Sequence, residues 1–147
     1  MLRRRLRSEE GAALVEFAIA VPVLLLIVWC MVDFSRAFYT SNSLASAVRE
    51  GARYASSRQD FGSANLDSIK TRVRHAFSPA GGDTLTNSKI TITVPSLATA
   101  GQVTVQVTGY EWYSTSPLTL FAVLSSGKRG ISMTRRATFR WERDYSS

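Results

Sequence analysis

The feature that most constrains this chain is an almost uninterrupted apolar run from Ala12 to Val32, in which Glu16 is the only charged side chain. At about 1.5 Å of rise per residue, this run forms a helix roughly 30 Å long, the thickness of the hydrocarbon core of a bilayer. Its leucine, isoleucine, valine and phenylalanine residues together favour insertion by roughly 5 kcal/mol, whereas an acid at the centre of a span costs about 2.5 to 3.5 kcal/mol. A membrane span is therefore predicted in spite of Glu16. An acid within a span is a functional candidate by default, and its plainer interpretation is an interfacial charge in the headgroup region.

The basic residues predict the orientation of this span. Four arginines crowd residues 3–7, before the run, whereas only Arg36 and Arg49 follow within about 20 residues, so the positive-inside rule keeps the N-terminus in the cytoplasm. A secretory signal has a shorter apolar core that ends at a small-residue cleavage site, and the run has neither property. We therefore expect a single-pass protein of the inner (cytoplasmic) membrane, with residues 33–147 outside.

Three motifs carry a resemblance to a known family, together with Pro22 and the block of leucine, isoleucine and valine that follows it. The motifs are Gly11-Ala12-Ala13-Leu14-Val15-Glu16-Phe17, Asp33-Phe34-Ser35-Arg36-Ala37 and Ala47-Val48-Arg49-Glu50-Gly51-Ala52-Arg53. Their order is similar to that of the TadE-like minor pilins, or pseudopilins, of the Tad (Flp) tight-adherence pilus, a type IV pilin-like system. The resemblance is strong from Gly11 to about Tyr54. Beyond it, only the order of the strands and the closing residues 137–142 resemble the family.

The resemblance implies how the protein is processed and assembled. A prepilin peptidase would cut the precursor on the cytoplasmic side between Gly11 and Ala12, and a glycine suits this site because it does not obstruct close approach of a protease. In the family's assembly, the glutamate at the position of Glu16, which precedes Phe17, pairs with the N-terminal amine of a neighbouring subunit. A partner cation offsets the cost of burying a carboxylate. The implied partners are other pilins or pseudopilins of the filament, the prepilin peptidase and the inner-membrane assembly platform.

Beyond the span, the helix is predicted to continue, so that it runs from about Glu10 to Ser56. Apolar residues recur at steps of three and four in residues 33–58, which predicts an amphipathic extension with one face that seats a globular domain. Gly51 costs this helix about 1 kcal/mol relative to alanine, so it indicates either close packing or an early helix end. Pro22 is interpreted either as a gentle kink or as the point where the helix loosens on leaving the bilayer.

Residues 59–147 are predicted to form an α+β domain outside the membrane. Asn65 is expected to cap a short amphipathic helix that ends before Pro79. Alternation of apolar and polar residues with period two then predicts three strands. The predicted strands cover residues 90–94, 103–108 and 131–142. The fold class is thus a long N-terminal helix, membrane-spanning in its first half and amphipathic in its second, packed against a small antiparallel sheet as in pilins.

Two segments of this domain leave alternatives open. Arg135 falls on the apolar side of the third strand, which indicates an edge position or a β-bulge. Ser116-Pro117 precedes an apolar stretch and opens either a short helix, with proline at its first position, or a buried loop.

The residue inventory argues against catalysis and against a metal or cofactor. His75 is the only histidine and Cys30, within the span, the only cysteine, so neither a metal site nor a catalytic triad is predicted. The predicted function is a structural one, in the membrane precursor or in the extracellular pilus. One alternative is an unprocessed, membrane-anchored periplasmic scaffold of the secretion complex.

A second alternative follows from the net charge of +7. Basic and aromatic residues cluster near the C-terminus and could bind nucleic acid or acidic polysaccharide. The cluster consists of Arg135, Arg136, Arg140, Trp141, Arg143 and Tyr145.

Overall fold

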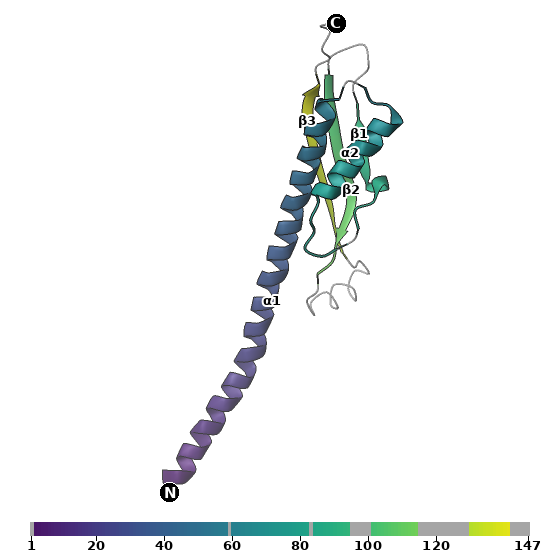
Figure 1. Cartoon of the computed structure of the whole chain (residues 1–147). Coiled ribbons are helices and arrows are strands. Elements are labelled where there is room, and N and C mark those ends of the chain that lie inside the picture. Colours follow the sequence, from purple (N-terminus) through teal and green to yellow (C-terminus); the bar gives the residue numbers. More distant parts are fainter. Residues whose placement is uncertain (1, 59, 83, 95–100, 115–129, 142–147) are drawn as a thin grey trace. The chain divides into compact units, whose positions relative to one another are not determined.

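The computed structural model of this chain describes residues 2–58, 60–82, 84–94, 101–114 and 130–141 (Figure 1). Its elements are α1 (Leu2–Ser56), α2 (Ser63–Ala76), the 3-10 helix η1 (Asn87–Lys89), and the strands β1 (Ile90–Thr93), β2 (Gly101–Trp112) and β3 (Ile131–Trp141). The chain divides into two compact units, Met1–Ser35 and Arg36–Ser147. The predicted fold class, a long N-terminal helix with a small antiparallel sheet, is confirmed.

The first unit consists of the beginning of α1. The helix starts at Leu2, earlier than the predicted Glu10, because leucine, arginine and glutamate are good helix formers and Gly11 alone does not stop them. It passes through Pro22 without a break and ends at Ser56, as predicted. By length and composition, α1 contains a segment able to cross a membrane.

Helix α2 begins at Ser63, so the prediction that Asn65 caps it is wrong. Gly62 occupies the N-cap position, and the backbone N–H of Leu66 donates to its carbonyl at 3.0 Å. Asn65 lies inside the first turn and donates from its side-chain amide to the carboxylate of Asp60. Asparagine favours cap positions because its side chain can accept a backbone N–H, and here the same side chain is used as a donor instead. The helix ends at Ala76, before Pro79, as predicted.

The three strands form an antiparallel sheet in the order β1-β2-β3. Val103, Val105 and Val107 of β2 are fully buried, and Ile90 and Ile92 of β1 are paired with Val107 and Val105, so these side chains share one face. That inner face contributes to one core with the second half of α1 and with α2. The predicted helix or loop at Ser116-Pro117 lies outside the described residues.

A β-bulge changes which residues of β2 are buried. The pairing passes from Val107 with Arg135 to Tyr110 with Met133, so Thr108 and Gly109 stand opposite a single residue of β3. Gly109 has φ +66°, a left-handed conformation that suits glycine. Burial consequently moves from odd-numbered to even-numbered positions, with Tyr110 and Trp112 in the core. The predicted strand ended at residue 108 because the alternation of apolar and polar residues is interrupted there, whereas β2 continues through the bulge to Trp112. Both alternatives for Arg135 hold, since β3 is an edge strand and Arg135 borders the bulge.

The core brings Gly51 of α1 against α2. A Cβ atom added at Gly51 would lie 2.3 Å from Cγ2 of Val73, a fully buried side chain. Because α1 continues past Gly51 to Ser56, close packing is the correct alternative and an early helix end is excluded.

We predict that Gly51→Ala lowers the free energy of unfolding of the second unit by about 2 kcal/mol. Overpacking a core costs up to about 3 kcal/mol, and alanine regains about 1 kcal/mol through its higher helix propensity. Denaturant titration of the full chain in detergent, followed by near-UV circular dichroism, measures the loss. Ser46→Ala, which places an alanine at an exposed position of the same helix, is the control and should stay within about 0.5 kcal/mol. If the lower free energy of unfolding of Gly51→Ala comes from a clash with Val73, adding Val73→Ala should reduce the loss caused by Gly51→Ala. An unchanged loss in that background would contradict the packing explanation.

Candidate functional site

Polar side chains of α1 bind the loop that follows α2. Arg36 donates from Nε to the carbonyl of Ala80 at 3.1 Å, and the backbone N–H of Ala80 donates to the hydroxyl of Thr40 at 3.1 Å. The backbone N–H of Ser78 donates to Ser43 Oγ at 2.9 Å. Thr40 is fully buried, and its hydroxyl also donates to the carbonyl of Arg36 at 2.9 Å. We call Arg36, Thr40 and Ser43 the loop clamp, because they satisfy the backbone of a turn and so fasten it to α1.

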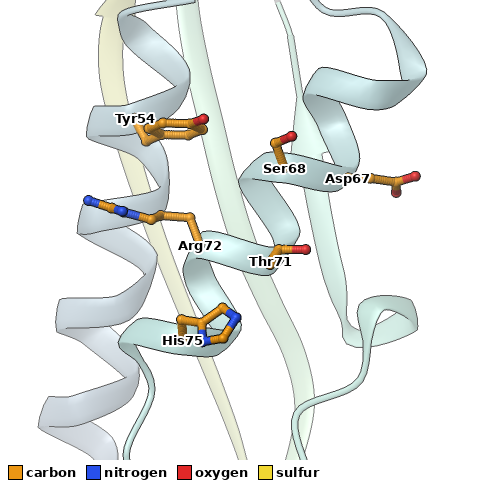
Figure 2. A pocket seen from close by; sticks show the side chains of 6 residues that line it. All are labelled: Tyr54, Asp67, Ser68, Thr71, Arg72 and His75. Carbon is orange, nitrogen blue, oxygen red and sulfur yellow. The ribbon is translucent and has the colours of Figure 1, made fainter.

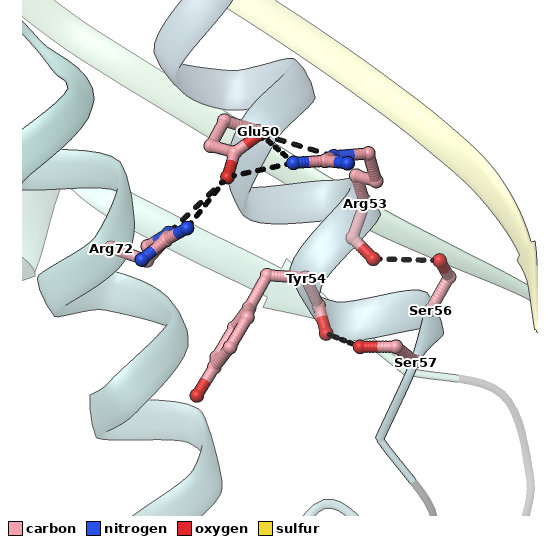
Figure 3. Close-up of polar contacts among 6 residues, drawn as sticks. All are labelled: Glu50, Arg53, Tyr54, Ser56, Ser57 and Arg72. Atoms are coloured by element: carbon pink, nitrogen blue, oxygen red, sulfur yellow. Dashed lines mark hydrogen bonds and ion pairs between the residues drawn. The ribbon is translucent and has the colours of Figure 1, made fainter.

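Within the core-packing part of α1, Glu50 joins α1 to α2 (Figure 3). Its carboxylate accepts from Arg53 at 2.9 Å and from Arg72 of α2 at 3.1 Å. The hydrogen bonds from Arg53 and then Arg72 lower the pKa of Glu50. Surface ion pairs of this kind contribute little stability each, so their value here lies in fixing how α2 lies along α1.

Next to this ion pair, Tyr54, Arg72 and His75 border a shallow hollow of about 420 Å³ between α1 and α2 (Figure 2). Arg58 stacks over the Tyr54 ring at 4.2 Å from its centroid. Ser68, also at the hollow, donates its hydroxyl to the carbonyl of Ala64 in its own helix. His75 is exposed, and the described residues contain no group of three potential metal-ligating side chains.

The structure divides the three motifs into residues that seat the domain and residues that face outward. Arg36 belongs to the loop clamp, and Glu50, Gly51 and Ala52 contact or approach the rest of the second unit, with Ala52 fully buried. Arg53 supports Glu50 within the same helix. Ala47 and Val48 are fully buried core residues, and Ala37 packs against that core. Phe34 and Arg49, in contrast, are exposed, and Asp33 is half-buried.

At the N-terminal end of α1, the residues proposed for processing and assembly lie along an exposed helix. Gly11, Ala12 and Glu16 are exposed, and Phe17 is 68% exposed. A Cβ atom at Gly11 would meet no other atom within 4 Å. Among the side chains that the structure describes, none forms a salt bridge with Glu16, so the helix presents a carboxylate and a surrounding apolar surface to whatever lies outside the chain.

The described basic residues of the C-terminal cluster lie on both faces of the sheet. Arg135 contacts Ser41 of α1, whereas Arg136, one position later on β3, donates to Gln106 at 3.2 Å on the opposite face of the sheet. Trp141 is 1% exposed and donates from Nε1 to the carbonyl of Arg58 at 2.7 Å, so its ring is a core residue and offers no face for stacking on a base. Arg143 and Tyr145 lie outside the described residues.

Sequence reasoning missed Thr40, Ser43 and Tyr110 as docking residues. Tyr110 donates its hydroxyl to the carbonyl of Gly81 at 3.2 Å. Gly81 directly follows Ala80, which the loop clamp binds. The available signal was a hydroxyl residue, Thr40, four positions before Leu44, on the buried face of α1. A buried helical hydroxyl requires a partner, and the partner could only be identified in the folded chain.

Comparisons with known proteins agree with the resemblance stated from the sequence. A family model described as TadE-like protein matches residues 11–53, under a third of the chain, and this confirms the TadE-like assignment for that segment. The match ends at Arg53, within the contacts that seat the domain, and it indicates a pilin-like protein associated with a Tad pilus, a structural class and not a catalytic one. Neither the curated proteins nor the solved structures give a significant match.

We predict that Glu50→Gln lowers the melting temperature at neutral pH by a small amount that disappears in acid. The pKa of Glu50 is lowered in the folded state, so its ion pairs stabilise the fold above its unfolded-state pKa and cease to do so as the pH falls through the folded-state value. Thermal melts of wild type and variant across this pH range measure the difference. Arg49→Gln, at the neighbouring exposed position, should give no such pH-dependent difference. A wild-type advantage that persists at the acid end would show that Glu50 acts by some other means.

Proposed function

We propose that this protein is a minor pilin or pseudopilin, a structural subunit of a Tad (Flp) type IV-like pilus that joins the filament through its N-terminal helix. The observation that carries the proposal is the first part of α1: an apolar helical segment whose side chains are exposed along almost its whole length, within the segment that matches the TadE-like family model. The structure of the second unit supports a role as a carrier of this helix, because its polar contacts and core fasten the domain to the second half of α1.

An exposed apolar helix of this length requires a non-aqueous environment. Leu14, Phe17 and Ile19 are each more than 60% exposed, and soluble monomers rarely leave a large contiguous apolar surface in water. A bilayer core satisfies such a helix, and so does a bundle of similar helices. The same surface therefore serves a precursor stored in the inner membrane, with its N-terminus in the cytoplasm, and a subunit packed in the extracellular filament.

Within this helix, Glu16 supplies the specific contact. An acid surrounded by apolar groups is costly unless a cation pairs with it. Cleavage between Gly11 and Ala12 creates such a cation, the α-amine of Ala12, on each subunit. We propose that the carboxylate of one subunit pairs with the amine of a neighbouring pilin, which fixes the axial register between the helices. Phe17 and the adjacent apolar side chains exclude water around the pair.

The first test is the identity of the N-terminus. We expect mass spectrometry of the protein extracted from membranes of its native host to show Ala12 as the first residue. A Gly11→Leu variant should keep the arginine-rich leader, because a large side chain obstructs the approach of a peptidase. If the wild-type protein retains its leader in cells that produce the pilus, the alternative of an unprocessed periplasmic scaffold is favoured and assembly through a new N-terminus fails.

The second test removes the charge at Glu16. We expect Glu16→Gln to insert into membranes like wild type but to reduce incorporation into sheared filaments at least tenfold. Breaking a buried pair costs about 3 to 5 kcal/mol, and about 1.4 kcal/mol already corresponds to a factor of ten. Glu16→Asp, which keeps the charge, should lose less. Immunoblots of sheared filaments and of carbonate-washed membranes separate the two effects, and normal incorporation of Glu16→Gln would rule the pairing out.

A further inference from the structure

Exposed apolar side chains are distributed unevenly over the second unit. Among its described residues, the most exposed large apolar side chains are Phe38 at 61%, Ile131 at 59% and Tyr39 at 54%. The next two, Val94 and Phe139, are each 37% exposed. We call Phe38, Tyr39 and Ile131 the apolar end.

Contacts within the unit show that these residues belong to the same end of it. Arg36 lies two positions before Phe38, and its side chain reaches Gly81. A Cβ atom added at Gly81 would lie 2.8 Å from the guanidinium of Arg36 and 3.9 Å from Nε1 of Trp112, so Gly81 lies close to both side chains. Trp112 is in turn the pairing partner of Ile131. The beginning of this part of α1, the end of β2 and the start of β3 therefore come together.

The other end of the unit has a different character. There, Trp141 packs against Phe61 with ring centroids 5.4 Å apart, and its indole N–H is bonded to Arg58. The rings of Trp141 and Phe61 are buried and half-buried, and Asp60 and Arg140 are exposed beside them in the sequence. The apolar side chains of Val94 and Phe139, which lie towards this end, are each only 37% exposed. Among the described residues, the most exposed large apolar side chains of the unit therefore lie at the end from which the chain continues towards the apolar run.

The position of Phe38 in the sequence limits how far this end can lie from a bilayer that holds the run. Phe38 follows Val32 by six residues of continuous helix, about 9 Å of rise. The headgroup layer adds about 5 to 7 Å on each side of the hydrocarbon core. Helical side chains tilt towards the N-terminus of their helix, so the rings of Phe38 and Tyr39 reach back towards this layer. Aromatic residues are enriched at this depth, and Trp29 near the end of the run is a further example.

From these observations we propose that the apolar end is a lipid-binding surface, which rests in the headgroup layer of the outer leaflet while the protein is held in the membrane. The proposal rests on membrane anchoring through the apolar run, as in the proposed function, but not on processing or on assembly. Its consequence is that the domain is held against the bilayer by a second contact besides the span. Entry into a filament would have to release this contact.

Fluorescence quenching in vesicles tests the proposal on the full chain. Single cysteines at Tyr39, Ile131 and Phe139, each in a Cys30→Ser background, carry a polarity-sensitive dye, and the vesicles contain phosphatidylcholine with or without a nitroxide at the headgroup end of the acyl chains. We expect Tyr39→Cys and Ile131→Cys to be quenched at least threefold more than Phe139→Cys. Phe139 is the matched control because it lies on the same strand and the same face as Ile131 but towards the other end.

A dye on the natural Cys30 distinguishes a failure of the proposed lipid-binding surface from a failure of the membrane anchor. Dye attached to it in the otherwise wild-type protein should be quenched by a nitroxide deep in the acyl chains if the run is inserted. If Cys30 is quenched but Ile131 is quenched no more than Phe139, the lipid-binding surface is refuted and the anchor stands. If Cys30 is not quenched, the anchor fails and this inference fails with it. Near-UV circular dichroism of each labelled variant establishes that the domain remains folded.

Discussion

The cost of leaving the first part of α1 in water is the constraint on which the rest of the molecule depends. Apart from Glu16, the segment from Ala12 to Val32 carries no charged side chain, and the structure leaves its apolar side chains exposed. The hydrophobic effect scales with the area removed from water, so this helix requires lipid or other helices. In such surroundings the carboxylate of Glu16 has the largest free-energy cost of burial unless a partner binds it. This one residue can therefore determine which partner binds a helix surface that is otherwise uniformly apolar.

The second half of α1 has a different role, because it holds the small α+β domain in place through non-covalent contacts. The described residues contain one cysteine, Cys30, and it lies in the apolar run. Fastening is achieved by small residues that allow close approach, such as Gly51 and Ala52, by the loop clamp and by the ion pairs of Glu50. These contacts lie in the last part of the segment that matches the family model, which ends at Arg53.

Much of the architecture could be predicted because it follows local periodicity. The end of α1 at Ser56 and the strand starting at Ile131 are set by patterns that a single sequence displays. Two features could not be predicted in this way. Helix α2 has Gly62 at its N-cap, while the side chain of Asn65 is bonded to Asp60, and the alternation along β2 is reversed by a bulge at Gly109. At the candidate site, Glu16 and Gly11 stand out in the sequence, whereas Thr40 and Tyr110 act through long-range contacts that only the folded chain shows.

The central claim is that the apolar helix meets other pilin helices and that Glu16 lies at that contact. Site-specific photo-crosslinking from position 17 in cells that assemble the pilus tests this claim most directly, because a photoreactive amino acid at Phe17 reports whatever lies against the helix beside Glu16. The account predicts adducts whose cross-linked peptide comes from the first residues of a second pilin, and their loss in cells that lack the prepilin peptidase. Adducts to lipid alone, unchanged by removal of the peptidase, would contradict it.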